Sequence, residues 1–174
     1  QLFNYYGAPD ADRIIIAMGS VNDVIEEVID YLNAHGEKVG LVKVRLFRPW
    51  SSKHLLAAIP ETVKKIAVLD RTKEPGSQGE PLYQDVVMAL AKCGCHNVPV
   101  IGGRYGLGSK DTTPASFFAV YEELAKEESK EEFTLGIVDD VTYLSLDEKV
   151  SPNTAAEGTI ECKFWGLGGD GTVG

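Results

Sequence analysis

Short apolar runs, separated by charged and glycine-rich stretches, divide the chain into predicted strands. The consecutive residues Ile14, Ile15 and Ile16 are typical of a strand buried on both faces of a sheet. Similar runs bounded by turn residues predict further strands. The predicted strands cover residues 13–18, 39–47, 66–69, 98–101 and 133–138, with a weaker strand at residues 2–6.

Between these strands, apolar residues recur at the spacing of amphipathic helices. The clearest stripe consists of Val21, Val24, Ile25, Val28, Ile29 and Leu32. Ser20 and Asp23 before and within it have the spacing of a capping box. Further helices are predicted near residues 51–59 and 81–92, and from Pro114 through Leu124. Pro81 and Pro114 stand in first turns, where a missing N–H costs nothing.

The alternation of strands and helices predicts an α/β fold. We expect a three-layer α/β/α sandwich with a mostly parallel sheet and right-handed crossovers. The charge run at residues 126–132 is interpreted as the solvated end of a helix, and residues 151–158 as a linker.

Composition narrows the possible functions. The 174 residues suffice for one domain with a core, and 44% of them are hydrophobic. A net charge of −9 argues against nucleic acid and anionic membranes as partners. No apolar run approaches the roughly 20 residues of a membrane span.

The three cysteines form an odd number, which favours a reducing cytoplasm over a disulfide scaffold. The run Cys93-Gly94-Cys95-His96 invites a metal or redox hypothesis, but a closed zinc site takes four ligands. We interpret Cys93 as the end of a helix, Gly94 as its cap and Cys95 as the start of the next connection.

Two charged loops follow predicted parallel strands, so both are expected at the carboxyl edge of the sheet. They supply the candidate interface residues Asp70, Arg71, Lys73, Glu74, Arg104 and Lys110. The first loop is alternatively an acid–base set, although no nucleophile stands beside it. The second is alternatively a clamp for a phosphate or carboxylate. We favour contacts with a neighbouring domain for both, and we predict no catalytic residue.

Two weaker patterns also follow strands. Gly19 and Ser20 join a strand to a helix and suggest either an anion site or, preferably, a tight turn. The adjacent Asp139 and Asp140 resemble a magnesium pair, but neighbouring side chains on a strand face opposite ways. A turn is therefore favoured, and no metal ligand is predicted.

Six segments resemble one family, in its order along the chain. The strongest is residues 68–86, VLDRTKEPGSQGEPLYQDV; the others are residues 7–10, 43–50, 102–114, 136–146 and 162–174. They resemble the second domain of pyruvate:ferredoxin (flavodoxin) oxidoreductase. The resemblance implies the fold of the transketolase carboxyl-terminal domain, a five-stranded sheet whose first strand, here residues 2–6, runs antiparallel.

The resemblance also implies a function for a longer parent enzyme. That enzyme converts pyruvate, coenzyme A and oxidised ferredoxin to acetyl-coenzyme A, CO2 and reduced ferredoxin, using thiamine diphosphate, Mg and [4Fe-4S] clusters. The fragment itself is expected to be structural and inactive, with no cofactor. Its expected partners are the enzyme's other domains, and ferredoxin or flavodoxin through the parent, which is expected to be a cytoplasmic homodimer.

Residues 1–150 are expected to form the domain, and residues 151–174 a linker with the truncated start of the next one. In the family that next domain is associated with coenzyme A. Its glycine-rich opening loop supplies the candidate cofactor-binding residues Gly168, Asp170, Gly171 and Thr172. The alternatives are a stand-alone flavodoxin-like ligand-binding domain and a related 2-oxoacid:ferredoxin oxidoreductase.

Overall fold

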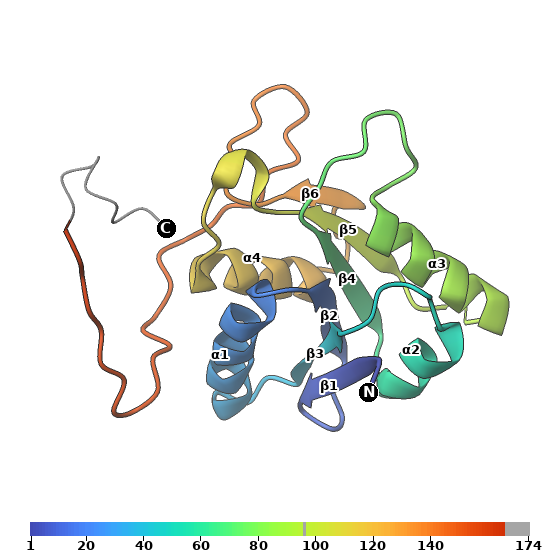
Figure 1. The fold of residues 1–174 in the computed structure, drawn as a ribbon, viewed down its shortest axis with the longest axis horizontal. Coiled ribbons are helices and arrows are strands. Elements are labelled where there is room, and N and C mark those ends of the chain that lie inside the picture. Colours follow the sequence, from blue (N-terminus) through green and yellow to red (C-terminus); the bar gives the residue numbers. More distant parts are fainter. Residues whose placement is uncertain (96, 166–174) are drawn as a thin grey trace.

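The computed structural model describes residues 1–95 and 97–165 and has the predicted three-layer α/β/α architecture (Figure 1). Its strands are β1 (Phe3–Gly7), β2 (Arg13–Met18), β3 (Val39–Val44), β4 (Lys65–Asp70), β5 (Val100–Arg104) and β6 (Glu132–Thr134). Its helices are α1 (Val21–Ala34), α2 (Ser52–Ala58), α3 (Pro81–Cys93) and α4 (Pro114–Ala125), with a short 3-10 turn at Leu107–Ser109.

The strands form one sheet in the order β1-β3-β2-β4-β5-β6. β1 is antiparallel to β3, as expected, and the other neighbouring pairs are parallel. The expected number of five strands is wrong: six pair in the described residues, because β6 adds a short parallel strand beside β5.

Alternation of side chains along the strands builds two cores. Ile15 and Ala67 face α1 and α4, where Phe117 is fully buried. Ile14 and Val68, one residue away on the same strands, face α2 and α3. The isoleucine run is therefore buried because both faces of β2 are covered by helices (Figure 1).

Some predicted boundaries are wrong. β3 ends at Val44 rather than residue 47, β5 begins at Val100 rather than residue 98, and the last strand covers Glu132–Thr134 instead of residues 133–138. The charge run after α4 therefore contains the start of β6. The predicted capping box is also absent, since Ser20 makes no side-chain hydrogen bond at the start of α1.

The end of α3 follows the predicted order: Cys93 is the last helical residue, and Gly94 adopts a left-handed conformation with φ 76°. The structure differs from the expectation drawn from the cysteine count, because Cys93 and Cys95 are joined by a disulfide. Proximity in the turn after the helix produces this pairing, and an odd total does not exclude it.

After β6, residues 135–146 form a loop with one bridge from Ser145 back to Thr134. Residues 147–165 then run without helix or strand along the outside of the domain, near α1 and α4 in Figure 1. None of the helices in the described residues is long and apolar enough to cross a membrane.

Candidate functional site

A broad hollow lies at the carboxyl edge of the sheet. It has a volume of about 890 Å³ and is formed by the segments after β2, β4 and β5 together with residues 110–113. Met18 and Gly19 line one side, Asp70 and Arg71 the middle, and Tyr105 the far side. The two charged loops of the sequence prediction thus meet here, as expected.

The topology explains the position of this hollow. β2 pairs with β3 on one side and with β4 on the other. The connection that follows β2 therefore leads toward one edge of the sheet, and the connection that follows β4 leads toward the opposite edge. The connections after β2 and β4 therefore diverge to opposite faces and leave a crevice at the carboxyl ends of the strands. Open α/β sheets place ligands and contacts in this crevice.

Asp70 acts inside the domain. The residue is only 5% exposed, and its two carboxylate oxygens accept hydrogen bonds from the backbone N–H groups of Leu82 (3.0 Å) and Tyr83 (3.1 Å). These are free donors in the first turn of α3, so a residue of β4 caps that helix from a distance. Burial raises the pKa of Asp70, and the two N–H groups oppose the shift.

Arg104, at the end of β5, also serves the domain. Its Nε lies 2.6 Å from Glu80 Oε1, and a terminal guanidinium nitrogen lies 2.6 Å from Glu132 Oε2. The arginine side chain is 11% exposed and that of Glu80 is 3% exposed. Arg104 thus differs from the expected exposed interface charge, because its guanidinium joins the start of α3 to β6.

The remaining predicted interface charges lie on the surface. Arg71, Lys73, Glu74 and Lys110 are exposed, and no ion pair within the described residues involves them. Arg71 packs its side chain against Gly106, where a Cβ would lie 2.8 Å from the arginine Nε. Arg71 and Lys110 line the hollow, and all four charges are exposed to groups outside the domain.

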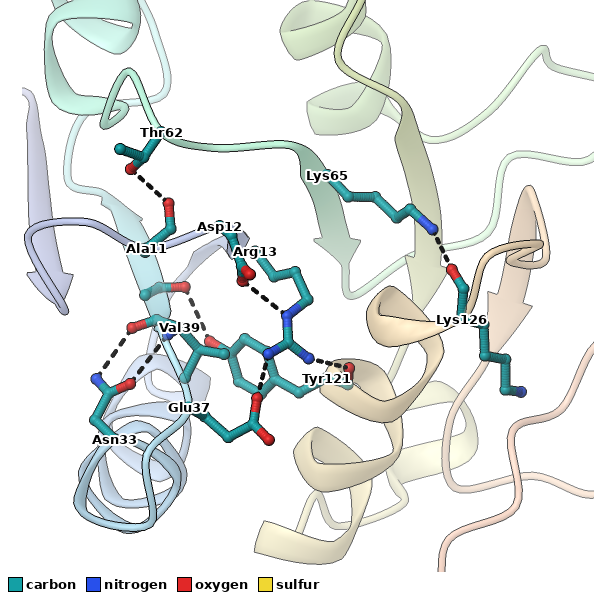
Figure 2. A network of polar contacts seen from close by, with 11 residues as sticks. Ala11, Asp12, Arg13, Asn33, Glu37, Val39, Thr62, Lys65, Tyr121 and Lys126 are labelled. Carbon is teal, nitrogen blue, oxygen red and sulfur yellow. Dashed lines mark hydrogen bonds and ion pairs between the residues drawn. The ribbon is translucent and has the colours of Figure 1, made fainter.

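The amino edge of the sheet contrasts with this arrangement (Figure 2). Arg13 Nε lies 2.9 Å from Asp12 Oδ1, and the same guanidinium pairs with Glu37 and faces the Tyr121 carbonyl. The buried Tyr121 hydroxyl donates to the Gly40 carbonyl at 2.9 Å, and burial raises its pKa well above the usual value. A hollow of about 470 Å³ adjoins this network, but its charges largely satisfy one another.

The glycine link after β2 and the adjacent aspartates Asp139 and Asp140 both lie in turns. Gly19 adopts φ +86° and links β2 to α1. The Asp139 carboxylate accepts hydrogen bonds from the backbone N–H groups of Val141 (2.9 Å) and Thr142 (3.0 Å) and from the Thr142 hydroxyl. These bonds lower the pKa of Asp139 to about 2. Across residues 1–95 and 97–165, no three His, Cys, Asp or Glu side chains gather as a potential metal site.

The sequence reasoning missed Glu132 and Tyr105. Glu132 reaches Arg104 only because β6 lies beside β5, and the Tyr105 hydroxyl donates to the Met18 carbonyl at 3.3 Å across the hollow. The order of the strands was the missing information. The candidate loop residues Gly168, Asp170, Gly171 and Thr172 lie outside the described residues, as does His96.

These features define a doubly wound α/β domain with a closed amino edge and an open, charged carboxyl edge. The family model described as "Pyruvate:ferredoxin oxidoreductase core domain II" matches residues 11–117. The chain belongs to this family.

Similar proteins agree with this assignment. The chain is 59% identical over 174 residues to the pyruvate:ferredoxin oxidoreductase of Moorella thermoacetica and 56% identical over 177 residues to the pyruvate-flavodoxin oxidoreductase of Enterobacter agglomerans. Each alignment covers 100% of this chain and 15% of the relative, so the chain spans a small part of those proteins.

A solved structure supports the fold. It is a 2-oxoglutarate:ferredoxin oxidoreductase from Magnetococcus marinus with 2-oxoglutarate, coenzyme A and succinyl-CoA bound. It matches with a TM-score of 0.50 and 23% identity, over 71% of this chain and 20% of that one. At this identity the match concerns the architecture alone.

Proposed function

We propose that this chain is the second core domain of a longer enzyme that oxidatively decarboxylates pyruvate. The reaction converts pyruvate, coenzyme A and oxidised ferredoxin to acetyl-coenzyme A, CO2 and reduced ferredoxin. The observation that carries the proposal is identity of 56–59% along the whole chain to proteins named for pyruvate. The neighbour named for 2-oxoglutarate is only 23% identical, so pyruvate is favoured over a related 2-oxoacid.

Within that enzyme, the domain acts as a structural element that binds neighbouring domains through its carboxyl edge. The exposed Arg71, Lys73 and Lys110 support this role because they lack ion-pair partners among the described residues. The loop after β6 adds Val138 and Tyr143, which are 91% and 73% exposed. Exposed apolar side chains and cations without internal partners are both typical of a surface that another domain covers.

We assign the chemistry of the parent to groups held outside this domain. A [4Fe-4S] cluster takes four cysteine thiolates, whereas the chain has three cysteines, two of them in a disulfide. Thiamine diphosphate stabilises the carbanion of such decarboxylations when it is bound. We assign it, Mg, the clusters and coenzyme A to the other domains, with Gly168, Asp170, Gly171 and Thr172 as candidate contributors to the coenzyme A domain.

The proposed partners follow from this assignment. They are the other domains of the same chain and, through the parent, ferredoxin or flavodoxin. The parent is proposed to be a cytoplasmic homodimer. Residues 1–150 form the domain in this proposal, and residues 151–174 connect it to the next. The exposed course of residues 147–165, without helix or strand, supports the boundary.

A domain replacement tests the proposal. The matching segment of the Moorella thermoacetica enzyme is exchanged for this chain, and pyruvate- and coenzyme A-dependent reduction of a viologen dye is measured. We expect an assembled chimera with turnover close to that of the parent. A chimera that assembles with its full iron content and does not oxidise pyruvate would refute the assignment to this reaction.

The interface role needs a second set of chimeras. Reversing Arg71, Lys73 and Lys110 to glutamate should reduce assembly and turnover, although exposed charges contribute only about 0–1 kcal/mol to a domain's own stability. Lys53→Glu is the matched control, because Lys53 is an exposed lysine on α2, away from the hollow. Equal assembly and turnover of the triple variant and the control would exclude the carboxyl edge as an interface.

A further inference from the structure

The turn that ends α3 brings two cysteines together by backbone bonding alone. The N–H of Gly94 donates to the Ala91 carbonyl at 3.1 Å, and the N–H of Cys95 donates to the Leu90 carbonyl at 3.0 Å. This pair of bonds, with a left-handed glycine between the cysteines, is a Schellman motif. Neither bond involves a sulfur atom, so the turn does not depend on the disulfide.

The motif places the cysteines at a distance suited to a disulfide. Their Cα atoms are 5.5 Å apart, within the range of about 4.4–6.8 Å that disulfides span. Both residues are exposed to solvent. Cys162, the third cysteine, is also exposed but lies in the segment without helix or strand and has no such neighbour.

The same backbone also suits the reduced form. Cys93 Sγ lies 3.1 Å from the carbonyl oxygen of Leu90, a position from which a thiol donates a weak hydrogen bond to the last turn of the helix. Lys92 and the other residues of that turn need not move, because the Schellman bonds are common to both forms. A site whose backbone fits dithiol and disulfide alike is suited to reversible exchange.

We propose that Cys93 and Cys95 form a reversible dithiol–disulfide site that exchanges with disulfide-bonded small molecules of the glutathione class. One thiolate attacks the small-molecule disulfide, which forms a mixed disulfide and releases one thiol. The second cysteine then displaces the other thiol and closes the Cys93–Cys95 bond. The two cysteines lose two electrons and two protons, and the oxidant gains both as it is cleaved to two thiols.

The proposal is independent of the role in pyruvate oxidation. The pair lies at the carboxyl end of α3, while the hollow of the carboxyl edge lies at the other end of that helix, near Pro81. Exchange at the cysteines is therefore measured on the 174-residue chain without the parent's turnover. A failure of the domain-replacement experiment would leave this result unaffected.

The test equilibrates the chain in glutathione buffers from reducing to oxidising, quenches with acid, alkylates the free thiols and maps the peptides by mass spectrometry. We expect an intramolecular Cys93–Cys95 disulfide that forms and disappears reversibly along the series. Cys162, the internal control, should form only a mixed disulfide with glutathione. The proposal would be overturned if Cys93 and Cys95 formed only mixed disulfides with glutathione, as Cys162 does. It would also be overturned if neither Cys93 nor Cys95 reacted with glutathione disulfide.

Variants of Gly94 test whether the turn organises the pair. A Cβ at Gly94 meets no atom within 4 Å, so Gly94→Ala introduces backbone strain and no steric clash. It should lower the equilibrium constant for closing the disulfide about tenfold, because a left-handed alanine is unfavourable and the dithiol can leave this conformation, whereas the disulfide holds it in place. Gly94→Asn should stay near the parent value, because asparagine tolerates this conformation. An unchanged constant in Gly94→Ala would refute the role of the turn.

Discussion

Replacing Asp70 with alanine should destabilise the domain strongly, although Asp70 lies at the edge of a hollow. The change removes the acceptors of the N–H groups of Leu82 and Tyr83. Loss of a helix cap costs about 0.5–2 kcal/mol, and a buried unsatisfied donor adds about 1–3 kcal/mol. Removing the buried carboxylate also removes the cost of burying its charge, which offsets part of these two costs. We therefore expect the free energy of unfolding to fall by about 2–4 kcal/mol.

Two further variants separate hydrogen bonding from charge. Asp70→Asn keeps one acceptor oxygen but places an amide group beside the second N–H, so its loss should lie between those of Asp70→Ala and the parent. Asp139→Ala is the matched control, since Asp139 also accepts two backbone N–H groups but in an exposed turn. We expect it to change the free energy of unfolding far less.

Urea unfolding followed by circular dichroism measures these differences by linear extrapolation. A loss of about 3 kcal/mol corresponds to a decrease in Tm of about 6–12 °C for a chain of this size. If Asp70→Ala unfolded within about 0.5 kcal/mol of the parent, as surface variants do, Asp70 would not cap α3 in solution. Equal effects of Asp70→Ala and Asp139→Ala would refute the role of burial.

Other predictions concern single sites. Thr142→Val removes the hydroxyl that donates to Asp139 and should raise the pKa of Asp139 from about 2 toward 3.8. NMR titration of the Asp139 carboxyl group measures this pKa. Because the folded pKa is lowered, this carboxylate favours folding above about pH 4, and its contribution is lost as the pH falls toward 2; an unchanged pKa would contradict the assigned bonds. Gly103→Ala should lower the free energy of unfolding by about 1–3 kcal/mol, because the new Cβ would lie 2.4 Å from the ring of the buried Phe133. Gly102→Ala should lower it less, because its Cβ would lie 3.2 Å from the partly exposed ring of Tyr83. Urea unfolding measures both changes. Arg13→Met should lose about 0.5–1.5 kcal/mol in the same assay, since the carboxylates of Asp12 and Glu37 lose their partner but remain hydrated. A neutral result would remove the amino-edge network from the fold's stability.

Local patterns were sufficient for much of the fold. The isoleucines of β2 indicated a strand covered on both faces, and helices lie on both faces of it. Pro81 and Gly94 marked the two ends of α3 because each affects only its own backbone. Predictions of this kind depend on neighbours in sequence, which the sequence supplies directly.

Side-chain partners were harder to predict, because they depend on which strands are adjacent. Arg104 looked like an exposed charge on a loop, but β6 brings Glu132 beside it and α3 brings Glu80. Ser20 had the spacing of a cap and makes no capping bond, while Asp70 caps a helix 12 residues away in sequence. The order of strands in the sheet therefore determines whether a charged side chain lies on the surface or is paired inside the domain.

The two edges of the sheet differ in how their charges are satisfied, and this difference locates the surface available to partners. At the amino edge, Arg13 and Glu37 pair within the domain, so a partner there would have to break existing bonds (Figure 2). At the carboxyl edge, the partly buried Arg104 is already paired with Glu80, yet Arg71 and Lys110 remain exposed around the hollow. Since forming a new ion pair there requires no internal pair to be broken, the carboxyl edge is the favoured side for a neighbouring domain.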